Sequence, residues 1–321
     1  MEKIKSIHRE QLALNASATG TVNLTTVLPE SGFLRSIALQ MTATVSTAAS
    51  NTNTDGMIRL FDAVRVKANR NNFFCDVHGR RLFELNECDY GVAPRYDTLT
   101  NSLSSQVKRA NLLVDFAIDP RNPLDASTVI PLEALDSVVL EVSQQVPATA
   151  LGSTGSIAAG GTIDVILETI ELSKAEAEKI WPRGSPFKLT ISEKNKGITV
   201  AGTNYSNYLE YPSGNTVKDV LIWTELTASP NTPTDNETTQ FRVMDTQTKQ
   251  QLFENTFYGA VADDVREHSI APTYGGAFMI DHIANNGVGL SLENKRSGVV
   301  QFQFSNSATN FTIYAVFREI V

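Results

Sequence analysis

The chain has 321 residues, of which 41% are hydrophobic and only 19% are charged. Soluble globular proteins carry about 25% charged residues; here Thr, Ser and Asn take that place. This composition excludes a disordered acidic chain, a coiled coil and a collagen-like repeat, and it favours β-structure because Thr suits pleated surfaces while Asn and Gly suit turns. The net charge of -8 argues against a protein that coats nucleic acid, so we expect no direct sequence-specific nucleic-acid binding.

The first residues, 2–12, predict a short basic amphipathic helix. Its three basic residues, Lys3, Lys5 and Arg9, alternate with apolar side chains. Such a segment is typical of a foot that touches an anionic membrane surface or a neighbouring subunit. The alternative is a terminus that is ordered only by its own domain. The segment lacks the apolar core of a signal peptide, and the sequence holds no apolar run of about 18 residues that would predict a membrane-spanning helix.

Alternation with a period of two dominates the rest of the chain. From Phe33 to Val45 the odd positions are apolar except Arg35, and residues 58–68 and 311–317 alternate in the same way. Such stretches are typical of strands with one buried and one solvent-exposed face. Clusters of Ser, Thr, Asn, Pro and Gly between them indicate turns. The chain is therefore expected to be all-β.

Helices are predicted at only two further places, residues 97–109 and 173–181. The second has Ser173 as N-cap and Glu176 at the capping-box position, and a Pro/Gly break follows at residues 182–186. A short helix and a break between two strand-rich halves indicate a connector. The predicted domains are residues 1–172 and 187–321, joined by a linker of residues 173–186.

The two halves resemble each other in sequence. Residues 28–29 and 34–37 match residues 211–212 and 217–220 at a constant offset of 183. Three further matches follow in the same order: residues 82–91 with 252–259, 137–142 with 298–303, and 162–172 with 311–321. Four ordered matches indicate a duplication with about eight strands per half, and eight strands with uneven connections favour a two-sheet jelly roll.

No motif for catalysis, cofactor binding or metal binding stands out. The four histidines, His8, His78, His268 and His282, form neither HxH nor HExxH. Alternation places Cys75 and its neighbour Asp76 on opposite faces, which argues against a metal site with His78, and His268 is expected in a solvated charged loop. The two cysteines, Cys75 and Cys88, cannot form a disulfide framework, which indicates synthesis in a reducing cytoplasm.

One loop imitates part of a metal site. Residues 51–56 resemble the first half of a calcium loop, but Asn51 replaces the first Asp and Asp62 replaces the final Glu, so an ordinary loop is expected. A glycoside hydrolase stays open at this point because its two carboxylates can come from distant strands. No pair of carboxylates is singled out, so no catalytic residue and no cofactor are predicted.

Two tandem jelly rolls with a helical connector resemble the double jelly-roll major capsid proteins of tailless icosahedral phages with an internal membrane, and of adenovirus through its hexon. The resemblance covers essentially the whole chain and is closest to the compact phage members. It implies a virion protein that forms homotrimers, in which six jelly rolls make a pseudo-hexagonal capsomer. It also implies contacts with neighbouring capsomers, with penton and minor capsid proteins and, through the N-terminal segment, with the internal membrane.

A carbohydrate- or receptor-binding β-sandwich, such as a viral spike or a tandem lectin, is the main alternative function. Such a protein is expected to expose clustered aromatic side chains. Tyr205, Tyr208 and Tyr211 form one such cluster beside a predicted strand. Core packing or a subunit interface explains these residues equally well.

Overall fold

The computed structural model describes residues 4–69, 72–122, 125–152, 154–181, 187–226, 238–268, 273–283, 289–307 and 309–321. The chain divides into two units. The first comprises Met1–Asn86 and Ala93–Thr190, and the second comprises Glu87–Val92 and Ile191–Val321. None of the helices within the described ranges is long and apolar enough to cross a membrane.

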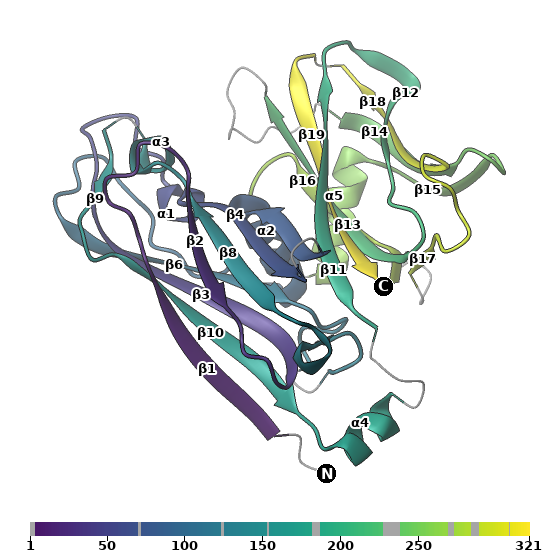
Figure 1. Ribbon diagram of the computed structural model, residues 1–321. Helices are drawn as coiled ribbons and strands as arrows, with labels where there is room; N and C mark the ends of the chain where they lie inside the picture. Colours follow the sequence, from purple (N-terminus) through teal and green to yellow (C-terminus); the bar gives the residue numbers. More distant parts are fainter. Residues whose placement is uncertain are drawn as a thin grey trace. The chain divides into compact units, whose positions relative to one another are not determined.

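The first unit is a sandwich of two sheets. Its strands are β1 (Ile4–Ala13), β2 (Val22–Val27), β3 (Phe33–Ser46), β4 (Phe61–Ala68), β5 (Asn72–His78), β6 (Gln106–Asp115), β7 (Ile130–Pro131), β8 (Val138–Gln144), β9 (Ser156–Ile157) and β10 (Thr162–Glu171). One sheet has the order β1-β10-β3-β6, and the other has the order β2-β8-β4-β5 (Figure 1). Counted over the eight long strands, these orders are 1-8-3-6 and 2-7-4-5, which is a jelly roll.

The second unit repeats this arrangement. Its strands are β11 (Leu189–Ile198), β12 (Gly202–Glu210), β13 (Thr216–Leu226), β14 (Thr238–Asp245), β15 (Gln250–Thr256), β16 (Ala277–Asp281), β17 (Leu290–Ser291), β18 (Val300–Asn306) and β19 (Phe311–Ile320). Here β11-β19-β13-β16 are neighbours in one layer, and β12-β18-β14-β15 form the other. The orders are again 1-8-3-6 and 2-7-4-5, so the two halves share one connectivity, as the ordered sequence matches predict.

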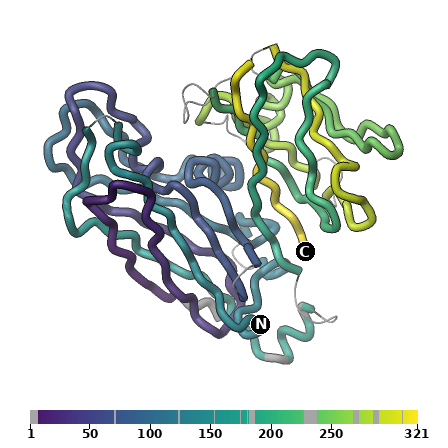
Figure 2. The backbone as a smooth tube through the Cα atoms, turned by 45° about the horizontal axis from the view of Figure 1, so that its top comes forward, coloured from purple at the N-terminus to yellow at the C-terminus, as the bar shows by residue number. Residues whose placement is uncertain are grey.

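Helices are short and occupy connections. They are α1 (Gly56–Arg59), α2 (Gly79–Tyr90), the 3-10 turn η1 (Leu132–Ala134), α3 (Pro147–Leu151), α4 (Lys174–Ile180) and α5 (Phe257–His268). The two longest, α2 and α5, have 12 residues each and directly follow the fifth strand of their unit. Figure 2 shows α2 as a blue coil.

Each sandwich buries an apolar core between its sheets. In the first unit, alternate residues of β3 are buried, from Ile37 to Val45. In the second unit, aromatic rings fill the core: the Phe241 ring centroid lies 4.7 Å from that of Phe278 and 5.3 Å from that of Phe302. Such pairs add about 0.5–1.5 kcal/mol each beyond the area that they bury.

The structure contradicts two of the predicted helices. The segment 2–12 is not helical where it is described, because residues 4–13 form β1 and pair with β10 over ten register positions. The predicted helix over 97–109 is also wrong, because residues 97–105 are not helical and the last four residues begin β6. Both segments have weak helical periodicity, and pairing with a long neighbouring strand outweighs a local preference of this size.

One of the four sequence matches between the halves aligns a helix with a strand. Residues 82–91 fall mostly in α2, whereas residues 252–256 belong to β15. That one match is therefore wrong, while the matches at β3 with β13, β8 with β18 and β10 with β19 join equivalent strands. The charged run before His268 is helix α5, not the expected loop.

The predicted helix over 173–181 is confirmed. In α4, Ser173 and Glu176 form the capping box: the Glu176 amide donates to Ser173 Oγ at 3.3 Å, and the Ser173 amide donates to Glu176 Oε2 at 3.0 Å. The predicted break at residues 182–186 lies outside the described residues.

Candidate functional site

A row of paired charges crosses the more exposed face of sheet β2-β8-β4-β5. Thr25, Glu141, Arg65 and Asp76 are successive register partners on its four strands. The Arg65 guanidinium donates from Nε to Asp76 Oδ1 at 2.9 Å and from Nη1 to Glu141 Oε1 at 2.8 Å. Lys67 donates to the second oxygen of Glu141 at 2.7 Å. Burial opposes ionisation of Glu141, but the bonds from Lys67 and Arg65 outweigh it and lower the pKa of this carboxyl.

The second unit carries a row at the same place. Tyr208, Gln303, Arg242 and Glu254 are successive register partners across β12, β18, β14 and β15. Arg242 donates from Nε to Gln303 Oε1 at 2.9 Å, and its Cζ lies 4.4 Å from the centroid of the Tyr205 ring. The Tyr205 hydroxyl donates to Glu254. The guanidinium is thus held by an amide and an aromatic ring instead of two carboxylates.

The two rows are equivalent by position. Arg65 and Arg242 are each the fifth residue of the fourth strand, and the acidic residues beside them are each the fifth residue of the fifth strand. The residue on the seventh strand is the fourth of that strand in both units. We call these two sets the arginine rows. Because the register, the arginine and the flanking acid coincide, the rows are a shared feature of the duplicated unit.

The predicted tyrosine cluster is not one site. Tyr211 is buried: its ring packs against Phe317 at 5.1 Å, and its hydroxyl lies 3.2 Å from Nε2 of His282. Only Tyr205 and Tyr208 stay near the surface, on the second arginine row. The Lys196 ammonium lies 4.1 Å from the centre of the Tyr208 ring, a cation–π contact.

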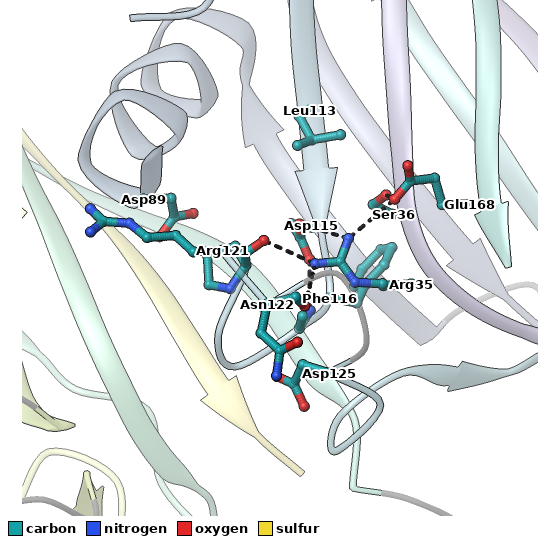
Figure 3. A network of polar contacts seen from close by, with 12 residues as sticks. Arg35, Ser36, Asp89, Leu113, Asp115, Phe116, Arg121, Asn122, Asp125 and Glu168 are labelled. Carbon is teal, nitrogen blue, oxygen red and sulfur yellow. Dashed lines mark hydrogen bonds and ion pairs between the residues drawn. The ribbon is translucent and has the colours of Figure 1, made fainter. Parts of the chain in front are cut away.

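Arg35, the one break in the alternation of β3, is the centre of a buried polar network (Figure 3). Its guanidinium donates to Glu168 Oε2 at 3.1 Å and to the carbonyl oxygens of Pro120 and Asn122 at 2.9 and 3.2 Å. It also lies 3.6 Å from Asp115. Arg35 therefore ties β3 and β10 to the loop that follows β6.

The second unit has a buried network on the corresponding strands. Arg318 of β19 forms two bonds of 2.6 Å with Asp219 of β13, and a third of 2.6 Å with Asp89, which belongs to the same unit. Burial opposes ionisation of Asp219, but Arg318 and Lys218 outweigh it and lower the pKa of this carboxyl. This bidentate geometry is the strongest form of an arginine–carboxylate pair.

The residues weighed for metal or acid–base chemistry lie apart. Cys75 is buried and its neighbour Asp76 is half-exposed, so alternation places them as predicted. His78 lies 3.8 Å from Asp62, and burial together with nearby arginines lowers the pKa of its imidazole well below the usual range. Among the described residues, no group of three or more His, Cys, Asp or Glu side chains is placed to hold a metal ion.

In the loop that imitates a calcium site, Asp55 is paired with cations. Its Oδ1 accepts from Arg59 Nε at 2.6 Å, and its Oδ2 lies 3.3 Å from Arg80. Asn51 adopts a positive φ of 60° at the start of the segment. These contacts make the segment the start of α1 instead of an oxygen cage.

The N-terminal residues form a strand and not a helix, so their side chains alternate between the two faces of β1. Arg9 is exposed, and Ile7 on the same face is 64% exposed. Lys5 belongs to β1, with its side chain outside the described part, and Lys3 lies outside the described residues altogether.

The arginine rows and the buried networks were not found from the sequence. Arg65 and Arg242 read as ordinary polar positions of alternating strands, because cross-strand partners lie far apart in sequence. The sequence did mark Arg35 and Lys218. Both are basic, and each is the second residue of its segment in the match between residues 34–37 and 217–220.

The comparisons with known proteins rest on structure. No family model matches the chain, and no curated protein sequence matches it. The crystal structure of the STIV MCP matches with a TM-score of 0.80 at 14% identity, over 100% of this chain and 97% of that chain. The PBCV-1 virus capsid matches at 0.60 and 14% identity, over 100% and 96% of the two chains.

A bacteriophage protein shows the same likeness. The major capsid protein of bacteriophage PM2 matches with a TM-score of 0.57 at 10% identity, over 98% of each chain. All three are double jelly-roll capsid structures. The tandem jelly-roll fold predicted from the sequence is therefore confirmed.

Proposed function

We propose that this chain is the major capsid protein of an icosahedral virus and is located in the virion. One observation carries the proposal: the whole chain, and not one half of it, takes the fold of the capsid proteins that it matches. A structural role, and not an enzymatic one, is inferred from the same fold. Synthesis in the host cytoplasm fits the two free and buried cysteines.

We infer that the chain assembles first as a homotrimer, and that trimers then meet neighbouring capsomers and penton and minor capsid proteins. In a trimer of a duplicated chain, six jelly rolls take similar positions. A surface that meets another copy is then expected in both halves, and the arginine rows satisfy this condition. Tyr and Arg are also enriched at interfaces. We therefore assign the subunit contact to the row-bearing sheet faces.

Sedimentation of the purified protein, followed by electron microscopy, tests this function. We expect trimers that form hexagonal sheets or shells, with an interface above about 1,600 Å² because a permanent capsomer resembles an obligate oligomer. A stable monomer at micromolar concentration would overturn the capsid proposal.

A row variant tests the assigned surface separately. Arg242→Ala is expected to weaken the trimer, whereas Arg296→Ala, which removes an exposed arginine at a turn, is expected to leave it intact. If Arg242→Ala still sediments as the wild-type trimer, the row face is not the subunit contact, while the capsid proposal stands.

We propose that the N-terminal segment, with Lys3, Lys5 and Arg9, contacts an anionic internal membrane. The exposed Ile7 and Arg9 on one face of β1 support this role. Contact with a neighbouring subunit is the competing outcome.

The second candidate function is carbohydrate or receptor binding. The observation that favours it is the pair Tyr205 and Tyr208, whose rings lie beside Arg242 and Lys196 on one sheet face. Glycan-array binding that is lost in Tyr208→Ala would support it, whereas trimers that bind no glycan would favour the capsid role.

A further inference from the structure

Helices α2 and α5 each hold an edge strand by the eighth residue of the helix. In α2 this residue is Asn86, which is buried. Its Oδ1 accepts from the backbone amide of Leu113 at 2.9 Å, and its Nδ2 donates to the carbonyl oxygen of Leu113 at 2.7 Å. Leu113 belongs to β6, the outer strand of its sheet. One amide side chain thus satisfies both backbone groups of one residue.

In α5 the eighth residue is Asp264, which is 1% exposed. Its two oxygens lie 3.0 and 3.3 Å from the backbone nitrogen of Met279. Met279 belongs to β16, the outer strand of the corresponding sheet. Asp264 therefore stands where Asn86 stands in the first unit, and it faces the same kind of backbone group.

An ionised carboxylate only accepts hydrogen bonds, whereas an amide both accepts and donates them. A protonated carboxyl group offers an acceptor oxygen and an O–H donor, whereas the amide of Asn86 offers an acceptor oxygen and N–H donors. Only the protonated form can repeat the donor-and-acceptor role that this position has in α2.

The surroundings of Asp264 also disfavour a negative charge. Among the side chains that the structure describes, the charged groups that act on its carboxyl are Asp263 and Glu267 on α5 and Asp281 on β16, and all three are acidic. Arg266 is exposed and is engaged by Asp263 and Glu267.

The other strands packed against α5 supply no free cation to Asp264. These strands are β14 and β15. Their charged residues bind elsewhere: Arg242 to Gln303, Asp245 to Lys295, and Glu254 to Tyr205.

We propose that Asp264 is a neutral, protonated carboxylic acid that clamps edge strand β16 to helix α5, and that loss of its proton releases this clamp. The device is pH-sensitive in the second unit, because the corresponding clamp in the first unit is the non-titrating Asn86. It is independent of the capsid role.

The titration behaviour agrees with this geometry. Burial raises the pKa of Asp264 to about 8; the Met279 amide acts in the opposite direction, and Glu267, Asp263 and Asp281 add to the rise. In the unfolded chain the same carboxyl titrates near 3.8. The folded state therefore binds one more proton than the unfolded state between these values, and the stabilisation from that proton is lost as the pH rises through this window.

Urea unfolding across pH, with wild type and Asp264→Asn compared, tests the proposal. The wild-type unfolding equilibrium constant is expected to rise relative to that of Asp264→Asn by up to tenfold per pH unit, from about pH 4 to about pH 8, and to stay level above it. Asp136→Asn, which removes the same charge at an exposed turn, is expected to follow the wild type. Asn86→Asp is expected to add the same pH dependence to the first unit.

Hydrogen exchange gives the local readout. Above about pH 8, the protection factor of the Met279 amide is expected to fall in the wild type and to persist in Asp264→Asn. If the unfolding equilibrium constants of wild type and Asp264→Asn depend on pH in the same way, Asp264 is not a neutral acid in the folded state. Equal Met279 protection in both at about pH 9 would overturn the release of the clamp.

Discussion

The two jelly rolls of this chain place different polar side chains around an arginine at equivalent strand positions. In the first arginine row, Arg65 lies between two carboxylates, whereas in the second row Arg242 lies between the amide of Gln303 and the ring of Tyr205. The strand positions are the same in both. The topology therefore fixes where a polar side chain needs a partner, and leaves open which chemical group that partner is.

The buried networks also occupy equivalent strands, but the cation and the acid have exchanged places. In the first unit the cation, Arg35, is on the third strand and the acid, Glu168, is on the eighth. In the second unit the acid, Asp219, is on the third strand and the cation, Arg318, is on the eighth. Both strand pairs have a register irregularity at this point, between Glu168 and Thr169 and between Val217 and Asp219.

The largest effect is expected for Arg318→Leu. This change removes the three bonds of 2.6 Å that Arg318 donates to the buried carboxylates of Asp219 and Asp89, so we expect a loss of about 3–5 kcal/mol in the free energy of unfolding. Urea denaturation measures it. Adding Asp219→Leu is expected to restore only part of the loss, because the bond from Arg318 to Asp89 is still missing. A loss below 1 kcal/mol for the single variant would show that the network is not needed for folding.

A smaller loss is expected for Arg35→Leu, about 2–3 kcal/mol, because Glu168 keeps a bond from Ser36 at 2.9 Å while the carbonyl groups of Pro120 and Asn122 lose their donor. Limited proteolysis is expected to cut first at residues 116–122. If residues 116–122 are cut no faster in Arg35→Leu than in the wild type, Arg35 does not anchor this loop.

The arginine rows are expected to differ in their response to salt. Arg65→Gln removes two ion pairs, so we expect a loss of about 1 kcal/mol at low ionic strength that shrinks as salt is added. Arg242→Gln removes a bond to a neutral amide and a ring contact, so its smaller loss is expected to depend less on salt. Equal salt dependence in both variants would show that the two rows do not differ in this way.

The smallest effect on stability is expected for substitutions in the N-terminal segment. Lys3, Lys5 and Arg9 replaced together by Ser are expected to leave trimers folded, because the exposed Arg9 lies outside the core. Flotation with anionic vesicles at low salt is expected to fall, since each charge adds up to about 1 kcal/mol of attraction. Arg95→Ser, Lys249→Ser and Arg296→Ser together, which remove three exposed charges outside the N-terminal segment and the arginine rows, serve as the control. Equal flotation of wild type and triple variant would favour a subunit contact.

Several features could be predicted from the sequence because they depend on local order. Alternation identified strands such as those over residues 33–45 and 311–317, and the ordered matches indicated the duplication. The motif Ser173 to Glu176 located α4, since a capping box satisfies its bonds within one turn. The tandem jelly-roll fold followed from these three observations.

Other features depend on partners that are distant in sequence. Residues 4–13 became a strand because β10 offered ten register partners, which a short helical pattern does not reveal. Arg65 meets Glu141 only when β4 and β8 are paired, and Asp264 meets Met279 only when α5 packs on β16. The sequence alone determined that the chain is built mainly of alternating strands and that the strand pattern occurs twice. The tertiary structure decided which polar side chains are paired and which acid is buried, because pairing and burial depend on distances between segments that folding brings together.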